Sequence, residues 1–64
     1  MTVRQIRDVI EFTNRVVVRK YSSPVLFNGR AFDLTDESVL SYEINVMWTE
    51  YDEDGSYLTI EIAE

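Results

Sequence analysis

The chain has 64 residues, which suits one domain spanning residues 1–64. It has neither cysteine nor histidine, which excludes disulfides, thiolate metal sites and the usual Cys–His or Ser–His catalytic pairs. The formal net charge is −6, and no apolar run approaches the roughly 20 residues needed to cross a bilayer. Arg4, Arg7 and Asp8 interrupt the first apolar positions, so we expect no signal peptide and no membrane, and a cytoplasmic location.

The first predicted element is a helix. Thr2 and Gln5 fit a capping box, in which each side chain bonds the backbone N–H of the other residue. Apolar residues then recur at helical spacing and form one stripe: Val3, Ile6, Val9 and Ile10. Thr13-Asn14 is expected to end this helix, because Asn tolerates the left-handed conformation of a C-terminal cap.

Residues 15–21 and 25–27 are predicted to form two antiparallel strands joined by a turn at Ser22-Ser23-Pro24. Three consecutive valines favour the extended chain in the first of them. Asn28-Gly29 is the strongest short hairpin signal, but only Arg30-Ala31-Phe32 follows before the next polar segment. We therefore favour a bulge or bend within one long strand at this dipeptide.

The second half of the chain predicts a short helix and a hairpin. Thr35 is expected to cap one or two helical turns. Residues 41–51 alternate as a strand, in which Trp48 is in phase with the residues expected in the core. Residues 52–55 form a polar turn, and residues 56–63 form the return strand.

The predicted fold class is α+β, in the order α-β-β-α-β-β. A small antiparallel sheet of about four strands carries the N-terminal helix on one face, with a short helical turn in the middle of the chain. One helix covers only one face, so the other face is open to solvent or a partner. By alternation, the open face carries Arg15, Val17, Arg19, Tyr21, Glu43, Asn45, Met47, Tyr51, Tyr57, Thr59 and Glu61. Tyr and Met are enriched at interface cores, although Tyr and Thr are also good strand formers.

Charge is unevenly distributed along the chain. Residues 1–32 hold all six basic residues and two acidic ones, whereas residues 33–64 hold ten acidic residues and no basic one. Phosphate repels such a chain, which disfavours direct binding of DNA or RNA. A basic protein partner is favoured, and a basic groove that normally holds nucleic acid is one such partner. The alternative is that the acidity only keeps a small protein soluble.

One segment nearly matches a calcium-binding EF-hand loop, with Asp52, Asp54, Gly55 and Glu61 at the expected spacing. Glu50 stands at the first position, where Asp is the rule, and the flanks alternate like strands where an EF-hand has helices. A polar turn is therefore the preferred interpretation, with calcium binding as an alternative. We expect no metal, no cofactor and no enzymatic activity, since nucleophile–base pairs and glycine-rich phosphate loops are absent from the sequence.

Three pieces of the chain resemble short proteins encoded by phages and prophages of Gram-positive bacteria: TVRQIRDVI from Thr2, FNGRA from Phe27 and LTIEI from Leu58. Most such proteins have no assigned function, so the resemblance assigns no functional residue. Some small acidic phage proteins are anti-CRISPR inhibitors that occupy the nucleic-acid groove of a defence complex. Together with the acidic half of the chain, the resemblance implies that role here.

The leading hypothesis is therefore a small acidic inhibitor that binds a basic surface of a host nucleic-acid-handling protein, such as a CRISPR effector, by mimicking nucleic acid. The candidate contact residues are Glu43, Glu50, Tyr51, Asp52, Glu53, Asp54, Tyr57 and Glu61. The alternative is a self-associating structural or accessory module, in which the open face or an edge strand pairs with its twin in a homodimer. Self-association would also stabilise a core that this short chain keeps small.

Overall fold

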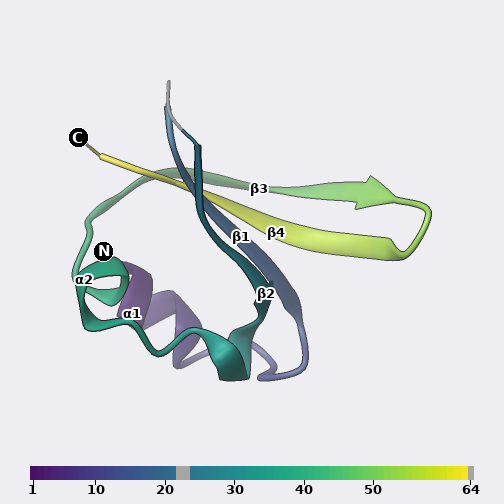
Figure 1. The fold of residues 1–64 in the computed structure, drawn as a ribbon, viewed down its shortest axis with the longest axis horizontal. Helices are drawn as coiled ribbons and strands as arrows, with labels where there is room; N and C mark the ends of the chain where they lie inside the picture. The colour runs from purple at the N-terminus through teal and green to yellow at the C-terminus, as the bar shows by residue number, and fades with distance from the viewer. Residues whose placement is uncertain (22–23, 64) are drawn as a thin grey trace.

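The computed structural model describes residues 1–21 and 24–63. Its elements, in chain order, are α1 (Val3–Arg7), β1 (Arg15–Lys20), β2 (Val25–Arg30), the 3-10 turn η1 (Ala31–Asp33), α2 (Glu37–Leu40), β3 (Ile44–Asp52) and β4 (Gly55–Ile62). The short helices lie on one side of a twisted sheet, and the β3–β4 hairpin projects sideways beyond them (Figure 1). The predicted α+β class is confirmed. In the described residues no helix is both long and apolar enough to span a membrane.

The sheet is mixed, and the prediction of a purely antiparallel sheet is wrong in one pairing. The strand order is β2-β1-β4-β3. The pairs β1–β2 and β3–β4 are antiparallel, as predicted, but β4 runs parallel to β1. The segment that connects β2 to β3 contains η1 and α2 and runs along the helix side of the sheet (Figure 1). The second hairpin therefore enters the sheet on the far side of β1.

Helix α1 is shorter than predicted, although the predicted capping box at its start is confirmed. It ends at Arg7 rather than at Thr13. The chain beyond it bonds to a distant segment instead of continuing the helix, since the carbonyl of Asn14 accepts a hydrogen bond from the backbone N–H of Ala31 at 2.8 Å. Val9, predicted to lie on the apolar stripe, is exposed as a consequence.

Strand β2 runs through Asn28-Gly29 without a turn, so this dipeptide lies within one strand, as favoured from the sequence. The predicted bulge at this dipeptide is wrong, because the pairing with β1 shifts between Val18 and Arg19, at the other end of β2. The ring of Phe27 lies 3.1 Å from the position that a Cβ at Gly29 would occupy, so a larger residue there would require the ring to shift slightly. Of the turn predicted before β2, Ser22 and Ser23 lie outside the described residues.

The short helix α2 begins one residue later than predicted. Asp36, and not Thr35, is its N-cap, and the carboxylate Oδ1 of Asp36 accepts from the backbone N–H of Ser38 at 2.9 Å. This hydrogen bond satisfies one of the free donors at the helix start.

The hydrophobic core lies between the helices and the two central strands. Its members are Val3, Ile6, Val16, Val18, Ala31, Leu34, Val39, Leu40, Ile60 and Ile62. The valines of β1 and the isoleucines of β4 that point to the helices are almost completely buried. The core therefore fixes β4, and with it the base of the projecting hairpin.

Strand β3 changes the direction of its side chains near its beginning. Ile44 pairs with Ile62 of the core, but the register then shifts, and Trp48 pairs with Thr59. An extra residue in one strand, here Asn45, moves every later side chain to the opposite face of the sheet. The prediction that Trp48 belongs to the core is therefore wrong.

We call the sheet face turned away from the helices the outer face. It carries the side chains of Arg15, Val17, Arg19, Val46, Trp48, Glu50, Tyr57, Thr59 and Glu61. Met47 and Tyr51, which the sequence placed on this face, lie on the helix side of the hairpin because of the same register shift. The outer face therefore carries Trp48, which the sequence placed in the core, and lacks Met47 and Tyr51.

Candidate binding surface on the β3–β4 hairpin

The β3–β4 hairpin extends beyond the rest of the sheet. β1 pairs with β4 only from Leu58 to Ile62, so the first part of β4 and the end of β3 have no further strand beside β4. Gly55 has φ of 113°, a conformation that glycine adopts readily, as predicted for this turn. The backbone N–H of Asp54 donates to Oδ1 of Asp52 at 2.9 Å, which holds the turn in one conformation.

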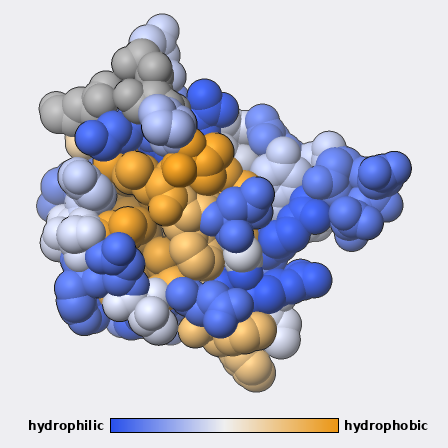
Figure 2. Space-filling model, viewed as in Figure 1, coloured by the Kyte–Doolittle hydropathy of each residue, from blue (hydrophilic) through white to orange (hydrophobic). Residues whose placement is uncertain are grey.

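Three consecutive acidic residues lie exposed at the end of the hairpin: Asp52, Glu53 and Asp54. Figure 2 shows that the projecting end of the molecule is hydrophilic, whereas hydrophobic residues gather where the helices meet the sheet. The local structure thus presents the densest acidic segment of the sequence on the most protruding part of the fold.

Arg15 offsets part of this negative charge. Its guanidinium lies 2.7 Å from the carboxylate of Asp52 and 3.8 Å from that of Asp54. The Arg15 Cζ atom also lies 4.5 Å from the ring centroid of Tyr57, in cation–π geometry. The hydrogen bond from Arg15 holds the pKa of Asp52 below its usual range. Arg15 therefore fixes the hairpin end to the start of β1.

Glu50 is the centre of a hydrogen-bond network on the outer face. Its carboxylate accepts from Trp48 Nε1 at 2.9 Å, from the Tyr57 hydroxyl at 2.7 Å and from the Thr59 hydroxyl at 3.2 Å. The hydrogen bond from Trp48 lowers the pKa of Glu50 most, the bond from Tyr57 comes next, and the charge of Arg19 adds to the effect. The hydrogen bond between Tyr57 and Glu50 also raises the pKa of Tyr57, because the neutral phenol is the donor. Glu50 therefore stays ionised at neutral pH.

The hydrogen-bond network around Glu50 also explains why Thr59 is buried on the outer face. Thr59 is only 1% exposed, although no helix covers this side of the sheet. The side chains of Trp48 and Tyr57 flank it, and its hydroxyl donates to Glu50. A buried hydroxyl costs little free energy when it has a hydrogen-bond partner. This end of the outer face is thus an ordered surface of fixed geometry.

The structure brings together five of the eight predicted contact residues and separates the others. Glu50, Asp52, Glu53, Asp54 and Tyr57 share the end of the hairpin.

The remaining predicted residues lie elsewhere. Glu43 precedes β3, and its carboxylate lies 3.0 Å from the amino group of Met1. Glu61 accepts a hydrogen bond from Asn45 Nδ2 at 3.1 Å, towards the other end of the sheet. Tyr51 is 79% exposed on the helix side of the hairpin. The acidic residues of the second half therefore do not form one continuous patch, and the candidate surface contracts to the hairpin end.

Sequence reasoning missed two members of the surface, Trp48 and Arg15. An uninterrupted alternation along residues 41–51 predicts Trp48 in the core, and the register shift at the start of β3 breaks that alternation. Arg15 was correctly expected on the open face, but its contact with the acidic turn was not. The opposite charges of the two halves of the chain are the signal that could have indicated this contact.

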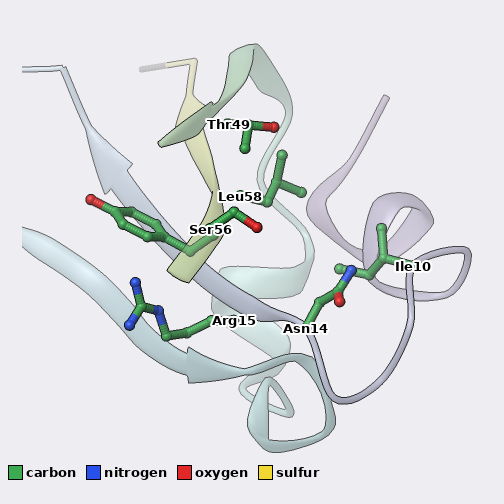
Figure 3. Close-up of a pocket in the computed structure, with 7 residues that line it drawn as sticks. Ile10, Asn14, Arg15, Thr49, Ser56 and Leu58 are labelled. Atoms are coloured by element: carbon green, nitrogen blue, oxygen red, sulfur yellow. The ribbon is translucent and has the colours of Figure 1, made fainter. Parts of the chain in front are cut away.

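A hollow of about 220 Å³ lies between the α1–β1 connection and the base of the hairpin. Its lining residues are Ile10, Asn14, Arg15, Thr49, Ser56, Tyr57 and Leu58. In Figure 3, Ile10 and Asn14 face the hairpin residues Thr49, Ser56 and Leu58 across this space. Arg15 is the one charged side chain among these lining residues, and it is paired with Asp52.

The described residues contain no group of three or more carboxylate, histidine or cysteine side chains placed to hold a metal ion. Strands flank the turn at Asp52 and Gly55, where an EF-hand would have helices.

No protein-family model matches this chain, and no curated protein and no solved structure is significantly similar to it. The function has to be inferred from the geometry of the surface.

Proposed function

We propose that this protein is a non-catalytic binding protein whose acidic hairpin end contacts a basic surface of a nucleic-acid-handling protein. We define the acidic hairpin end as Glu50, Asp52, Glu53 and Asp54. The observation that carries the proposal is the exposure of residues 52–54 on a projecting hairpin, where Arg15 is the one cation within salt-bridge distance of them among the described residues. Negative charge thus remains on the projecting end of the hairpin, where it is accessible to a partner.

The negative charge of this surface indicates the class of partner that it would bind. Arg15 offsets only part of the negative charge here, and the carboxylates repel phosphate, attract lysine and arginine, and accelerate the encounter with a basic surface. The pKa values of Glu50 and Asp52 lie below the ordinary values of 4.5 and 3.8, so both groups are ionised at neutral pH, as carboxylates normally are. A groove lined with basic residues for nucleic acid has the complementary charge. A CRISPR effector in the host cytoplasm is the partner that the resemblance to phage proteins suggests.

The rigidity of the hairpin end favours binding as well. Arg15, Trp48 and Tyr57 are fixed by hydrogen bonds or ring contacts, so little conformational entropy is lost when a partner binds. Arg, Trp and Tyr are also the residues most enriched among those that dominate interface energies. The acidic groups would steer the partner, and the aromatic groups would contribute contact area.

The test is the affinity for a CRISPR effector in three forms: free, bound to guide RNA, and bound to guide RNA and target DNA. We expect the tightest binding to the form whose basic groove is empty, because nucleic acid and the acidic hairpin end would compete for one surface. The double variant E53Q/D54N should weaken binding about tenfold, since two exposed charge contacts of about 0.7 kcal/mol each amount to about 1.4 kcal/mol.

The matched control is E11Q/D33N, which removes the same charge from other exposed positions. It should change the affinity less than about twofold, because neither residue belongs to the β3–β4 hairpin and the proposal gives neither a contact with the partner. Equal losses in the two variants would attribute binding to net charge alone and would contradict a specific role for the hairpin end.

A second candidate function, self-association, is favoured by the position of β3 at the edge of the sheet. Val46, Met47 and Tyr51 of this strand are large, apolar or aromatic, and exposed. Sedimentation velocity at several protein concentrations would distinguish the two functions. A tight dimer that survives high salt supports self-association, and a monomer at all concentrations contradicts it.

A further inference from the structure

The outer edge of β3 has free backbone hydrogen-bonding groups over most of its length. Only its first residue is covered there, since the N–H of Ile44 donates to the carbonyl of Met1 at 2.8 Å and Thr2 bridges to Glu43. From residue 45 to residue 52, no other described strand lies beside this edge. An unpaired edge of this kind can accept another extended chain by strand addition.

β3 also lacks the features that usually protect an edge strand. It has neither lysine nor proline, and no charged side chain occurs between Ile44 and Thr49. Its register shift lies at its beginning and leaves the remaining pairs regular. The opposite edge, β2, is shorter, is preceded by Pro24 and carries the exposed charge of Arg30. The two edges therefore differ in their readiness to pair, and β3 is the open one.

The side chains of β3 indicate what kind of chain would pair with it. Val46 and Trp48 point to the outer face near the middle of the strand, and Glu50 and Asp52 follow on the same face towards the turn. Neighbouring strands place opposite side chains about 5 Å apart. Apolar residues of an added strand would therefore meet Val46 and Trp48. Lysine or arginine would meet Glu50, which has no salt bridge among the described residues, and would approach Asp52 beside Arg15.

We infer that β3 binds an extended basic segment of the partner as a fifth strand of the sheet. This inference rests on the proposed function, because it names the mode in which a basic partner is held. Strand addition supplies affinity through the backbone, and the acidic hairpin end selects basic side chains. A second copy of this chain fits less well, because each copy has a net charge of −6 and its second half offers no lysine or arginine for the carboxylates.

The inference is tested with a synthetic peptide, acetyl-KTRTVTVTS-amide. Paired antiparallel to β3, one face of this peptide places Lys and Arg opposite Asp52 and Glu50 and its two valines opposite Trp48 and Val46. A second peptide has the same side chains but methyl groups on its three central backbone nitrogens, so it keeps its charge and cannot pair with a strand. Binding is followed by amide chemical shifts and amide hydrogen exchange of the full chain. We expect the shifts and the new protection to map to β3, and the methylated peptide to bind at least about tenfold more weakly.

Two variants compare the edges with the same change of charge. Thr49→Lys places a lysine on the β3 edge, and Asn28→Lys places one on the β2 edge; both positions are exposed. Thr49→Lys should weaken peptide binding about tenfold, and Asn28→Lys less than about twofold, because only the former repels the peptide at its site.

Several outcomes would overturn strand addition. Equal binding of the two peptides, or shifts that map to β2, would show that backbone pairing with β3 is not used. A dimer that forms through β3 and excludes the peptide would show that the edge serves a second copy. If E53Q/D54N still weakens binding of the intact partner in these cases, the proposed function stands and only the mode of binding is wrong. If E53Q/D54N has no effect on the partner while Thr49→Lys does, the role of the hairpin end fails and strand addition remains.

Discussion

Adjacent residues on the two faces of the sheet, Ile60 and Thr59, are equally buried but are held in place by different interactions. On the helix side, Val16, Val18 and Ile60 are at most 1% exposed and are held by apolar contacts. On the outer face, Thr59 is equally buried but is held by hydrogen bonds around the carboxylate of Glu50. Apolar contacts are non-directional and independent of pH, whereas the outer network depends on bond geometry and on an ionised carboxylate. The helix face therefore determines whether the chain folds, and the outer face determines the form of the surface it presents.

The largest expected effect is on the helix face. Ile60→Ala should lower the free energy of unfolding by about 3 kcal/mol, because it removes buried methyl groups and leaves a cavity. So small a domain has little stability to lose, so Ile60→Val, with an expected loss of about 1 kcal/mol, keeps the measurement within range. Urea unfolding followed by Trp48 fluorescence gives both values. A loss below that of an average surface substitution would show that the apolar face is not the main source of stability.

The neighbouring residue on the opposite face should respond less. Thr59→Val keeps the shape and the strand preference of the side chain and removes only its hydrogen bond to Glu50. We expect a loss of about 1 kcal/mol in the free energy of unfolding, typical of one intramolecular hydrogen bond. A cost as large as that of Ile60→Ala, measured in the same urea experiment, would mean that the two faces are equally important for folding.

The pH dependence of the free energy of unfolding measures the contribution of the outer face without any substitution in the core. The pKa values of Glu50 and Asp52 are lowered by folding, so both groups stabilise the fold above their ordinary values of 4.5 and 3.8. This contribution should disappear as the pH falls below those values and through the lower pKa values of the folded state. Glu50→Gln should flatten this acid limb, measured as the urea midpoint against pH. An unchanged acid limb in the variant would contradict the network.

The alkaline side has the opposite sign. Folding raises the pKa of Tyr57, so its hydrogen bond to Glu50 stabilises the fold below pH 10.0 and is lost as the pH rises through the raised value. Tyr57→Phe should remove this alkaline decrease, which is the smallest of the effects expected here. A decrease of the same size in Tyr57→Phe would assign it to another group.

Local features of the fold were predictable from sequence, and long-range ones were not. The capping box at Thr2 and the turn with Gly55 depend on residues within a few positions, and both are confirmed. The parallel pairing of β1 with β4 joins segments that are far apart in the chain and have no local signature. The order of the strands in the sheet could therefore not be predicted from local residue patterns.

The candidate site shows the same division. The density of acidic residues at 52–54 predicted an exposed acidic turn, because charged residues next to Gly avoid burial. The register shift at Asn45 could not be predicted, since the position of one extra residue depends on how β3 fits against β4. For this reason the sequence places Trp48 in the core, although its indole donates to Glu50. Half of the hydrogen-bond network around Glu50 on the outer face is therefore missed. The approach of Arg15 to Asp52 is likewise a product of the tertiary fold.

The most direct test of the central claim is the salt dependence of binding to a guide-free CRISPR effector, compared between the wild-type chain and E53Q/D54N. We expect wild-type affinity to fall steeply as salt is raised, and the variant to bind more weakly with a shallower salt dependence, because two charge contacts are missing. Wild-type affinity that does not change with salt, or a variant that follows the wild-type curve, would contradict the claim that the acidic hairpin end is the contact surface.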